Sequence, residues 1–277
     1  VRLGPKPWPR YWAKGSDERG KKHMRLATWN VNGIRARLER LLEWLLERSP
    51  DVVALQELKS DDDNFPYDEL KKSGMYVLAH CQKGWNGVAL LSKERPTLIE
   101  AGLPGFEDAG ARMIAAEIGQ VKAVSVYVPN GKDVDHDDYK AKLEWLEGFQ
   151  EYIADTFSPT DELFIGGDFK VAPEDIDSYD PEGLRETIFH TEKERKAFAS
   201  LLEWGLVDAF RLANPDLQFF TWWDYRGGNF HKNLGLRLDI VLLTKPLADR
   251  IESVWVDRDY RKGSKPSDHA PVIADLS

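Results

Sequence analysis

The sequence predicts an α/β domain that begins at Met24 and continues to the C-terminus. Three observations predict it. Short β-branched apolar runs recur along the chain, segments with helical spacing lie between some of them, and no repeat or linker interrupts residues 24–277. The chain has 277 residues, 42% hydrophobic and 31% charged, so it can bury a sizeable core and is not expected to be disordered.

The strand-like runs are short, and turn residues bound each of them. They are 26–31, 51–55, 87–91, 123–128, 163–165, 238–243 and 270–274. Their β-branched and aliphatic composition is typical of buried strands. We therefore expect a strand in each.

Three segments carry apolar residues at the spacing of one helix face. The first runs from Ile34 to Leu46 and the second from Tyr139 to Ile153. The third begins at Thr191, has a glutamate three residues later in the capping-box pattern, and ends near Gly205. These segments are the predicted helices.

Composition excludes several classes of protein. The single cysteine excludes a disulfide framework and a cysteine-rich zinc site, and it fits a reducing compartment. No apolar run approaches the roughly 20 residues of a membrane helix, and no secretory signal is visible. The net charge of −9 argues against nucleic-acid binding by bulk positive charge, but not against a local basic surface or a metal-bridged phosphate site.

Residues 1–23 differ from the rest of the chain. They hold seven Lys or Arg residues against two acids, together with several Pro, Gly and Trp residues and no regular period. We expect a flexible basic tail preceding the domain at 24–277. Such a tail could contact phosphates. The alternative, which we favour, is a solvated appendage without a role.

Polar residues stand at the ends of the predicted strands. They are Asn30, Asn32, Gln56, Glu57, Tyr127, Asp168, Asp239, Asp268 and His269. Each alone is ordinary, since Asn before Gly and Asp after Gly-Gly usually belong to turns. If the strand ends share one rim, however, four carboxylates converge there and repel one another unless a cation or a proton joins them. Oxygen ligands of this kind suit Mg²⁺ or Mn²⁺.

The order of six motifs resembles a known family. The motifs are Trp-Asn-Val-Asn-Gly-Ile-Arg at 29–35, Leu-Gln-Glu at 55–57, Gly-Asp-Phe at 167–169, Thr-Trp-Trp-Asp-Tyr-Arg at 221–226, Gly-Leu-Arg-Leu-Asp at 235–239 and Ser-Asp-His-Ala-Pro at 267–271. The set closely resembles the exonuclease III family of apurinic/apyrimidinic (AP) endonucleases, in the endonuclease/exonuclease/phosphatase superfamily. Single motifs are weak, but the ordered set is specific, and 221–226 indicates the DNA-repair branch. The resemblance spans the chain from Met24 onward.

The resemblance implies a four-layered α/β sandwich, in which helices flank two packed mixed β-sheets and the active site lies at one end. It implies metal-dependent cleavage of DNA 5′ to abasic sites, with 3′-5′ exonuclease and 3′-phosphatase or phosphodiesterase activity. The expected cofactor is Mg²⁺, with Mn²⁺ as a substitute. The expected partner is double-stranded DNA with abasic sites or blocked 3′ ends. We expect a monomer, without membrane association, in a bacterial cytoplasm near the nucleoid.

The resemblance also implies roles for the metal and phosphate residues. Glu57 is the principal metal ligand, with Asn30 and Asp268 nearby. His269 stabilises the charge that develops on the scissile phosphate, and Asp239 orients its ring. Such groups are needed because an anionic phosphodiester repels hydroxide.

Further roles follow from the same matched positions. Asp168 orients or deprotonates the attacking water, and Tyr127 contacts the phosphate or assists the leaving group. Trp222, Leu236 and Leu238 correspond to the apolar pocket for a flipped, base-less sugar. Taken alone, Leu238 is more simply a core residue. Arg112 and Lys83 lie in loops that the family uses near the DNA backbone, although single basic residues are usually ordinary surface charges.

One position departs from the family. Lys170 stands two residues after Asp168, where the family usually has Asn. Its cation could pair with Asp168 and impair catalysis, occupy the space of a metal ion, or bind a phosphate oxygen. Two alternatives to a repair nuclease follow. One is a catalytically weakened nucleic-acid-binding regulator on the same fold, of the type of the carbon-catabolite repression control protein. The other is a phosphatase or lipid phosphodiesterase of the superfamily, which segment 221–226 disfavours.

Overall fold

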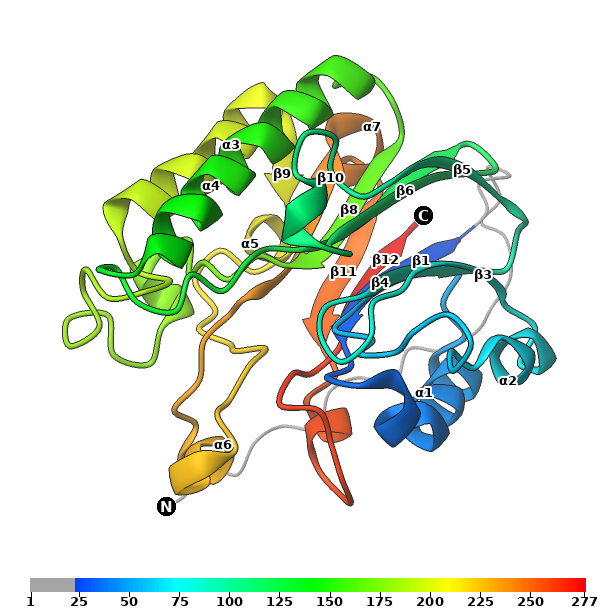
Figure 1. Cartoon of the computed structure of the whole chain (residues 1–277), viewed down its shortest axis with the longest axis horizontal. Coiled ribbons are helices and arrows are strands. Elements are labelled where there is room, and N and C mark those ends of the chain that lie inside the picture. The colour runs from blue at the N-terminus through cyan, green and yellow to red at the C-terminus, as the bar shows by residue number, and fades with distance from the viewer. Residues whose placement is uncertain (1–22) are drawn as a thin grey trace.

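The computed structural model describes residues 23–277, so residues 1–22 of the predicted tail lie outside the described residues. Two six-stranded sheets face each other, with helices on their outer faces, which gives four layers (Figure 1). The predicted α/β sandwich with two mixed sheets is confirmed.

The first sheet has the strand order β11-β12-β1-β2-β4-β3. Its strands, in chain order, are β1 (Met24–Asn30), β2 (Val52–Gln56), β3 (Tyr76–His80), β4 (Val88–Ser92), β11 (Ile251–Val256) and β12 (Val272–Leu276). β1 and β2 run parallel, and the other neighbours run antiparallel.

The second sheet has the order β5-β6-β7-β8-β10-β9. Its strands are β5 (Pro96–Ala101), β6 (Met113–Ile118), β7 (Val121–Tyr127), β8 (Leu163–Asp168), β9 (Leu206–Asp208) and β10 (Asp239–Thr244). Here too one central pair, β7 and β8, is parallel, and the other neighbours are antiparallel. Each sheet therefore contains one parallel pair with its two carboxyl ends side by side.

The predicted helices are α1 (Ile34–Arg48), α3 (Asp137–Thr156) and α4 (Glu192–Trp204). The capping box of Thr191 and Glu194 is confirmed, and α4 ends before Gly205, whose φ is 129°. Shorter helices are α2 (Tyr67–Lys72), α5 (Ala209–Ala213), α6 (Asn229–Lys232) and α7 (Lys245–Ala248). Within residues 23–277, no helix is long and apolar enough to cross a membrane.

Several strands were not among the predicted runs. β3 and β5 are edge strands. β3 is only partly buried, and β5 is mostly exposed, with Thr97 and Glu100 among its apolar residues. β11 is partly exposed, and β9 has only three residues. β6 is apolar and mostly buried, and it lies outside the predicted runs. β12 begins at Val272, later than predicted, because Ala270 donates its backbone N–H to Thr221 outside the sheet and Pro271 has no N–H.

Three apolar clusters hold the layers together. One lies between the sheets, one between the first sheet and α1, and one between the second sheet and α3 and α4. The sheets approach closely at Gly166, where a Cβ would lie 2.9 Å from the Cβ atoms of Ala54 and Thr28. Glycine is needed there because any side chain would push the two sheets apart.

Strand register brings the predicted site residues to one end of the sandwich. Asn30 is paired with Gln56 at the ends of β1 and β2. In the other sheet, Asp168 at the end of β8 is paired with Tyr127 of β7 on one side and with Asp239 of β10 on the other. The parallel pairs therefore create the shared rim that the sequence predicted.

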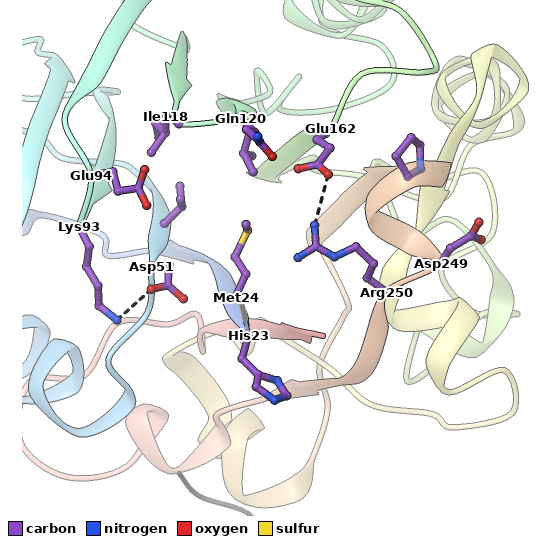
Figure 2. A pocket seen from close by; sticks show the side chains of 14 residues that line it. His23, Met24, Asp51, Lys93, Glu94, Ile118, Gln120, Glu162, Asp249 and Arg250 are labelled. Atoms are coloured by element: carbon purple, nitrogen blue, oxygen red, sulfur yellow. Dashed lines mark hydrogen bonds and ion pairs between the residues drawn. The ribbon is translucent and has the colours of Figure 1, made fainter. Parts of the chain in front are cut away.

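A cavity of about 930 Å³ opens at the opposite end of the sandwich, where Met24 and Val52 begin β1 and β2 (Figure 2). Two ion pairs lie within its lining, Lys93 with Asp51 at 3.0 Å and Arg250 with Glu162 at 3.3 Å (Figure 2). None of the predicted site residues lines it. This cavity is therefore separate from the candidate chemistry.

Gly167 provides a test of the packing at this rim. A Cβ there would lie 2.3 Å from the carbonyl oxygen of Val126 on the neighbouring strand. Gly167→Ala should lower the free energy of unfolding by about 2 kcal/mol, because the strand must shift to accept the methyl group. Urea denaturation measures this, with Glu147→Ala on exposed α3 surface as the control. Equal midpoints for both variants would contradict the packing described.

Candidate active site

Glu57, Asp168 and His269 form a buried cluster at this rim. Each offers a ligand atom, and these atoms all lie within 4.8 Å of one another. Two carboxylates and an imidazole at this spacing can hold a divalent cation. Asp268, predicted to lie near the metal, is adjacent in the chain but is not part of this cluster.

Left-handed backbone turns follow β2 and β8, at Glu57 and Lys170. Glu57 follows β2 with φ 52°, and Lys170 follows β8 with φ 52°. Left-handed backbone at a residue other than glycine costs about 1–3 kcal/mol and persists only where the surroundings enforce it. Here Glu57 accepts a hydrogen bond from the Gly33 N–H at 2.7 Å through its carbonyl. The local strain places the Glu57 carboxylate over the rim.

Asn30 joins the two carboxylates. Its Nδ2 donates to Glu57 Oε1 at 2.8 Å and to Asp168 Oδ2 at 2.8 Å. Its Oδ1 accepts from the backbone N–H of Asn32 at 3.0 Å. Asn30 therefore sits among the predicted metal residues, with its amide hydrogens bridging the acids.

Lys170 inserts its ammonium between the same acids. Its Nζ lies 2.7 Å from Asp168 Oδ2 and 3.8 Å from Glu57 Oε1, and the side chain is 7% exposed. Burial alone would raise the pKa of Glu57, but the cations of Lys170 and His269 hold it well below its usual range. Burial would likewise lower the pKa of Lys170, but Asp168 and the other acceptors keep it raised. The group is thus a lysine–carboxylate ion pair at neutral pH.

Two residues absent from the predicted site, Lys59 and Asn32, extend the network around Glu57. Lys59 Nζ lies 2.9 Å from Glu57 Oε2 and 2.5 Å from Asn32 Oδ1. Asn32 in turn donates to Asp268 Oδ1 at 2.8 Å. Asn32 was visible in the sequence as a polar residue at a strand end. Lys59 had no signal beyond its position two residues after Glu57.

His269 is held by Asp239, as the resemblance implied. His269 Nδ1 lies 2.7 Å from Asp239 Oδ2, and His269 Nε2 lies 3.7 Å from Asp168 Oδ2. Burial alone would lower the pKa of His269, but the carboxylates of Asp239 and Asp168 raise it to about 9. The ring therefore carries positive charge at neutral pH and can donate Nε2–H to an anion.

Tyr127 and Arg112 stack beside the acids. The guanidinium of Arg112 lies 4.9 Å from the Tyr127 ring centroid, and Lys170 Nζ lies 5.5 Å from it. Burial raises the pKa of the Tyr127 hydroxyl well above its ordinary value, so the phenol is neutral and can donate. Lys83 lies exposed in the loop between β3 and β4.

The predicted pocket residues are only partly accessible. Trp222 is half-buried and exchanges backbone hydrogen bonds with Leu236 at 2.9 and 3.0 Å. Its indole lies 6.5 Å from the His269 ring, and its Nε1 donates to Asp268 Oδ2 at 3.0 Å. Leu236 and Leu238 are 4% and 1% exposed, so Leu238 is buried like a core residue. Trp222 is therefore the most exposed of the three side chains.

Sequence comparison identifies the protein family to which this fold and candidate site belong. A model of the Endonuclease/Exonuclease/phosphatase family matches residues 27–269. The chain therefore belongs to the Endonuclease/Exonuclease/phosphatase family, and the resemblance found in the motifs is confirmed.

Similar proteins narrow the class to nucleases. Exodeoxyribonuclease III of Haemophilus influenzae is 36% identical, covering 91% of this chain and 100% of the relative. An AP endonuclease structure from Archaeoglobus fulgidus has TM-score 0.89 and 36% identity, covering 92% and 99%. A 3′-5′ exonuclease structure from Neisseria meningitidis has TM-score 0.89 and 39% identity, covering 92% and 100%. These similarities support a nuclease enzyme.

The His269–Asp239 pair predicts a pH-dependent stability. Since the pKa of His269 is raised from 6.5 to about 9, its contribution is complete below pH 6.5 and is lost as the pH rises through about 9. Asp239→Asn should therefore cost about 3 kcal/mol at neutral pH, because it leaves a buried imidazolium without its partner. Urea unfolding of both proteins from about pH 6 to about pH 10 checks this, and the difference should shrink at the alkaline end. A difference that stays constant or grows would contradict it.

Proposed function

We propose that this protein is a divalent-metal-dependent DNA-repair nuclease that cleaves the phosphodiester 5′ to abasic sites. Trimming or dephosphorylation of 3′ ends is its further activity. The observation that carries the proposal is the buried cluster of Glu57, Asp168 and His269, in which a charged imidazole stands beside two carboxylates. The names of its relatives, exodeoxyribonuclease III and DNA-(apurinic or apyrimidinic site) endonuclease, support this substrate.

The proposed metal ion is Mg²⁺, for which Mn²⁺ can substitute. Glu57 is the proposed principal ligand, with Asn30 and Asp268 close to it. Hard oxygen donors fit such an ion, and its positive charge would offset the repulsion between the buried acids that Lys170 and His269 now offset. When bound, the ion would neutralise charge on the phosphate as a Lewis acid.

The remaining groups have proposed roles around the phosphate. His269 donates Nε2–H to a phosphoryl oxygen as negative charge develops there, and Asp239 holds its ring. Asp168, oriented by the Asn30 amide at 2.8 Å, accepts a proton from the attacking water. Tyr127 donates its hydroxyl hydrogen to the phosphate or to the leaving oxygen.

We also infer the setting in which the enzyme acts. It would bind duplex DNA as a monomer, with Arg112 and Lys83 near the backbone. In a bacterium, a chromosomal substrate would place it in the cytoplasm. We propose that residues 24–277 form the catalytic domain, with residues 1–23 appended to it.

Cleavage of a duplex with an abasic-site analogue tests this function. With Mg²⁺, the duplex should be cut 5′ to the lesion, and Glu57→Gln should lower the rate at least about 100-fold, or 2.7 kcal/mol, because the ion loses a ligand. Product sizing measures the cut, and exposed Glu147→Gln is the matched control. Undiminished cleavage in excess EDTA would contradict the proposal.

One observation favours a second function, a weakly catalytic nucleic-acid-binding regulator. The 2.7 Å pair between Lys170 and Asp168 occupies the proposed base. This contact engages a carboxylate oxygen that would otherwise accept a proton from the attacking water. Opposite charges about 4 Å apart attract by about 4 kcal/mol at an effective dielectric of 20, which is a large part of one catalytic contribution.

Lys170→Asn distinguishes the two functions. It should raise the cleavage rate by about 100-fold or more, since Asp168 is released and an amide donor is gained. DNA affinity should change little. Single-turnover cleavage and a binding titration measure both, with exposed Lys140→Asn as control. A lower rate in Lys170→Asn would show that the ammonium assists catalysis as a phosphate-binding group.

Trp222 tests lesion recognition. Trp222→Ala removes both the aromatic wall and the hydrogen bond to Asp268, whereas Trp222→Phe removes only the bond. If the ring contacts the base-less sugar, kcat/KM on the abasic duplex should fall about tenfold further in the alanine variant than in the phenylalanine variant. Mn²⁺ affinity should be equal in the two. Equal kinetic losses would assign the effect to Asp268 and not to the pocket.

A further inference from the structure

A buried ion pair lies behind the candidate site. Lys142 of α3 and Glu194 of α4 contact each other with both side chains 0% exposed. The Lys142 ammonium makes a second bond, to the backbone carbonyl of Lys170 at 2.6 Å, and lies 4.9 Å from the Phe189 ring centroid. The pair therefore connects two helices to the backbone of a site residue.

Glu194 is held on both of its oxygens. Oε1 accepts from the Phe189 N–H at 3.1 Å, and Oε2 accepts from the Thr191 N–H at 3.1 Å and from the Thr191 hydroxyl at 2.8 Å. These bonds fix the carboxylate to the turn before α4. The Lys142 ammonium therefore contacts a carboxylate that is itself held in place.

A merely stabilising role accounts poorly for this arrangement. Desolvation of two buried charges usually offsets their attraction, so an apolar pair of similar volume would hold α3 against α4 equally well. An apolar pair would not, however, supply a donor to the Lys170 carbonyl. The bond to Lys170 is the feature that requires a hydrogen-bond donor at position 142.

Two loops that carry site residues meet at Lys142. After β8, Lys170 adopts φ 52°, and the next turn is tied down where Ala172 donates its N–H to the Phe189 carbonyl at 2.8 Å. After β7, the loop following Tyr127 packs on the lysine stem, since a Cβ at Gly131 would lie 3.1 Å from Lys142 Cδ. Both loops therefore lie against the same side chain, that of Lys142.

We propose that the Lys142–Glu194 pair is a positioning device that holds residue 170 in its left-handed conformation and aims its side chain at Asp168 and Glu57. Through residue 170 the pair controls how freely the two carboxylates accept a metal ion. This inference rests on the proposed function only in taking those carboxylates to be metal-binding. Lys142 touches neither carboxylate, so it acts through Lys170.

A double-mutant cycle on Mn²⁺ binding tests the inference. Lys142→Met with Glu194→Gln removes both buried charges together, which avoids leaving either unpaired. In the chain with Lys170, this double change should tighten Mn²⁺ binding about threefold or more, because the ammonium is no longer held over the ligands. In a Lys170→Ala background, the same double change should leave the dissociation constant unchanged, because no ammonium remains to be aimed.

Hydrogen exchange supplies the second readout. The amide of Ala172 should exchange about tenfold faster in the double variant, while that of Ala27 in β1 should be unaffected. Asp257→Asn is the matched control, since it breaks the Arg48–Asp257 ion pair of 2.7 Å, which does not contact the site. The control should alter neither Mn²⁺ affinity nor exchange at Ala172.

Equal changes in Mn²⁺ affinity with and without Lys170, or no change in either, would overturn the proposal. If the methionine variant does not fold, Lys142→Leu with Glu194→Gln, which also lacks both charges and the donor to the Lys170 carbonyl, is held to the same criteria. The titration uses the metal alone, so failure to cut abasic DNA would refute the proposed function and leave this result standing. If the chain binds no Mn²⁺, the proposed control of metal binding fails, whatever the exchange rate at Ala172.

Discussion

The structure depends on placing like-charged carboxylates together in a buried rim. Glu57, Asp168 and Asp239 are each less than a tenth exposed. Uncompensated, they would repel one another and lose their hydration, which a domain with a stability of about 5–15 kcal/mol cannot sustain. Lys170 and His269 provide the compensation by direct contact. The site is therefore organised around positive charge, and a divalent cation would enter a position that ammonium and imidazolium groups already serve.

The sheet topology is what makes such a rim available. Parallel strands end at the same edge, and each sheet has one parallel pair at its centre. Packing the two sheets face to face brings Asn30 of one to Asp168 of the other at 2.8 Å. Close packing at Gly166 keeps the sheets near enough for that bond. The chemistry thus depends on a glycine that has no functional group.

The sequence predicted much of this site because acids at strand ends have a recognisable pattern. Glu57 and Asp168 each follow an apolar run, and topology alone suffices to bring such residues together. Lys59 was not predicted as a site residue, because its role depends on a left-handed turn after β2 that no local residue preference indicates. Lys142 escaped for a different reason: at helical spacing it occupies an ordinary charged position, and only the packing of α3 on α4 buries it.

The fold was predictable where strands are buried and less so where they are exposed. Central strands such as β8 appear as continuous apolar runs because both faces are covered. The edge strand β5 interrupts that pattern, since it is mostly exposed and Thr97 and Glu100 stand among its apolar residues. Similarly, Lys170 was recognisable as a departure from the family motif, but its simultaneous approach to Asp168 and Glu57 depends on strands from both sheets.

The central claim is that Lys170 and a divalent ion compete for the same carboxylates. Anomalous diffraction from a crystal of this protein soaked in Mn²⁺ tests it most directly. We expect an anomalous peak in contact with Glu57, accompanied by movement of Lys170 Nζ away from its 2.7 Å contact with Asp168 Oδ2. A peak elsewhere in the molecule, with that contact unchanged, would contradict it.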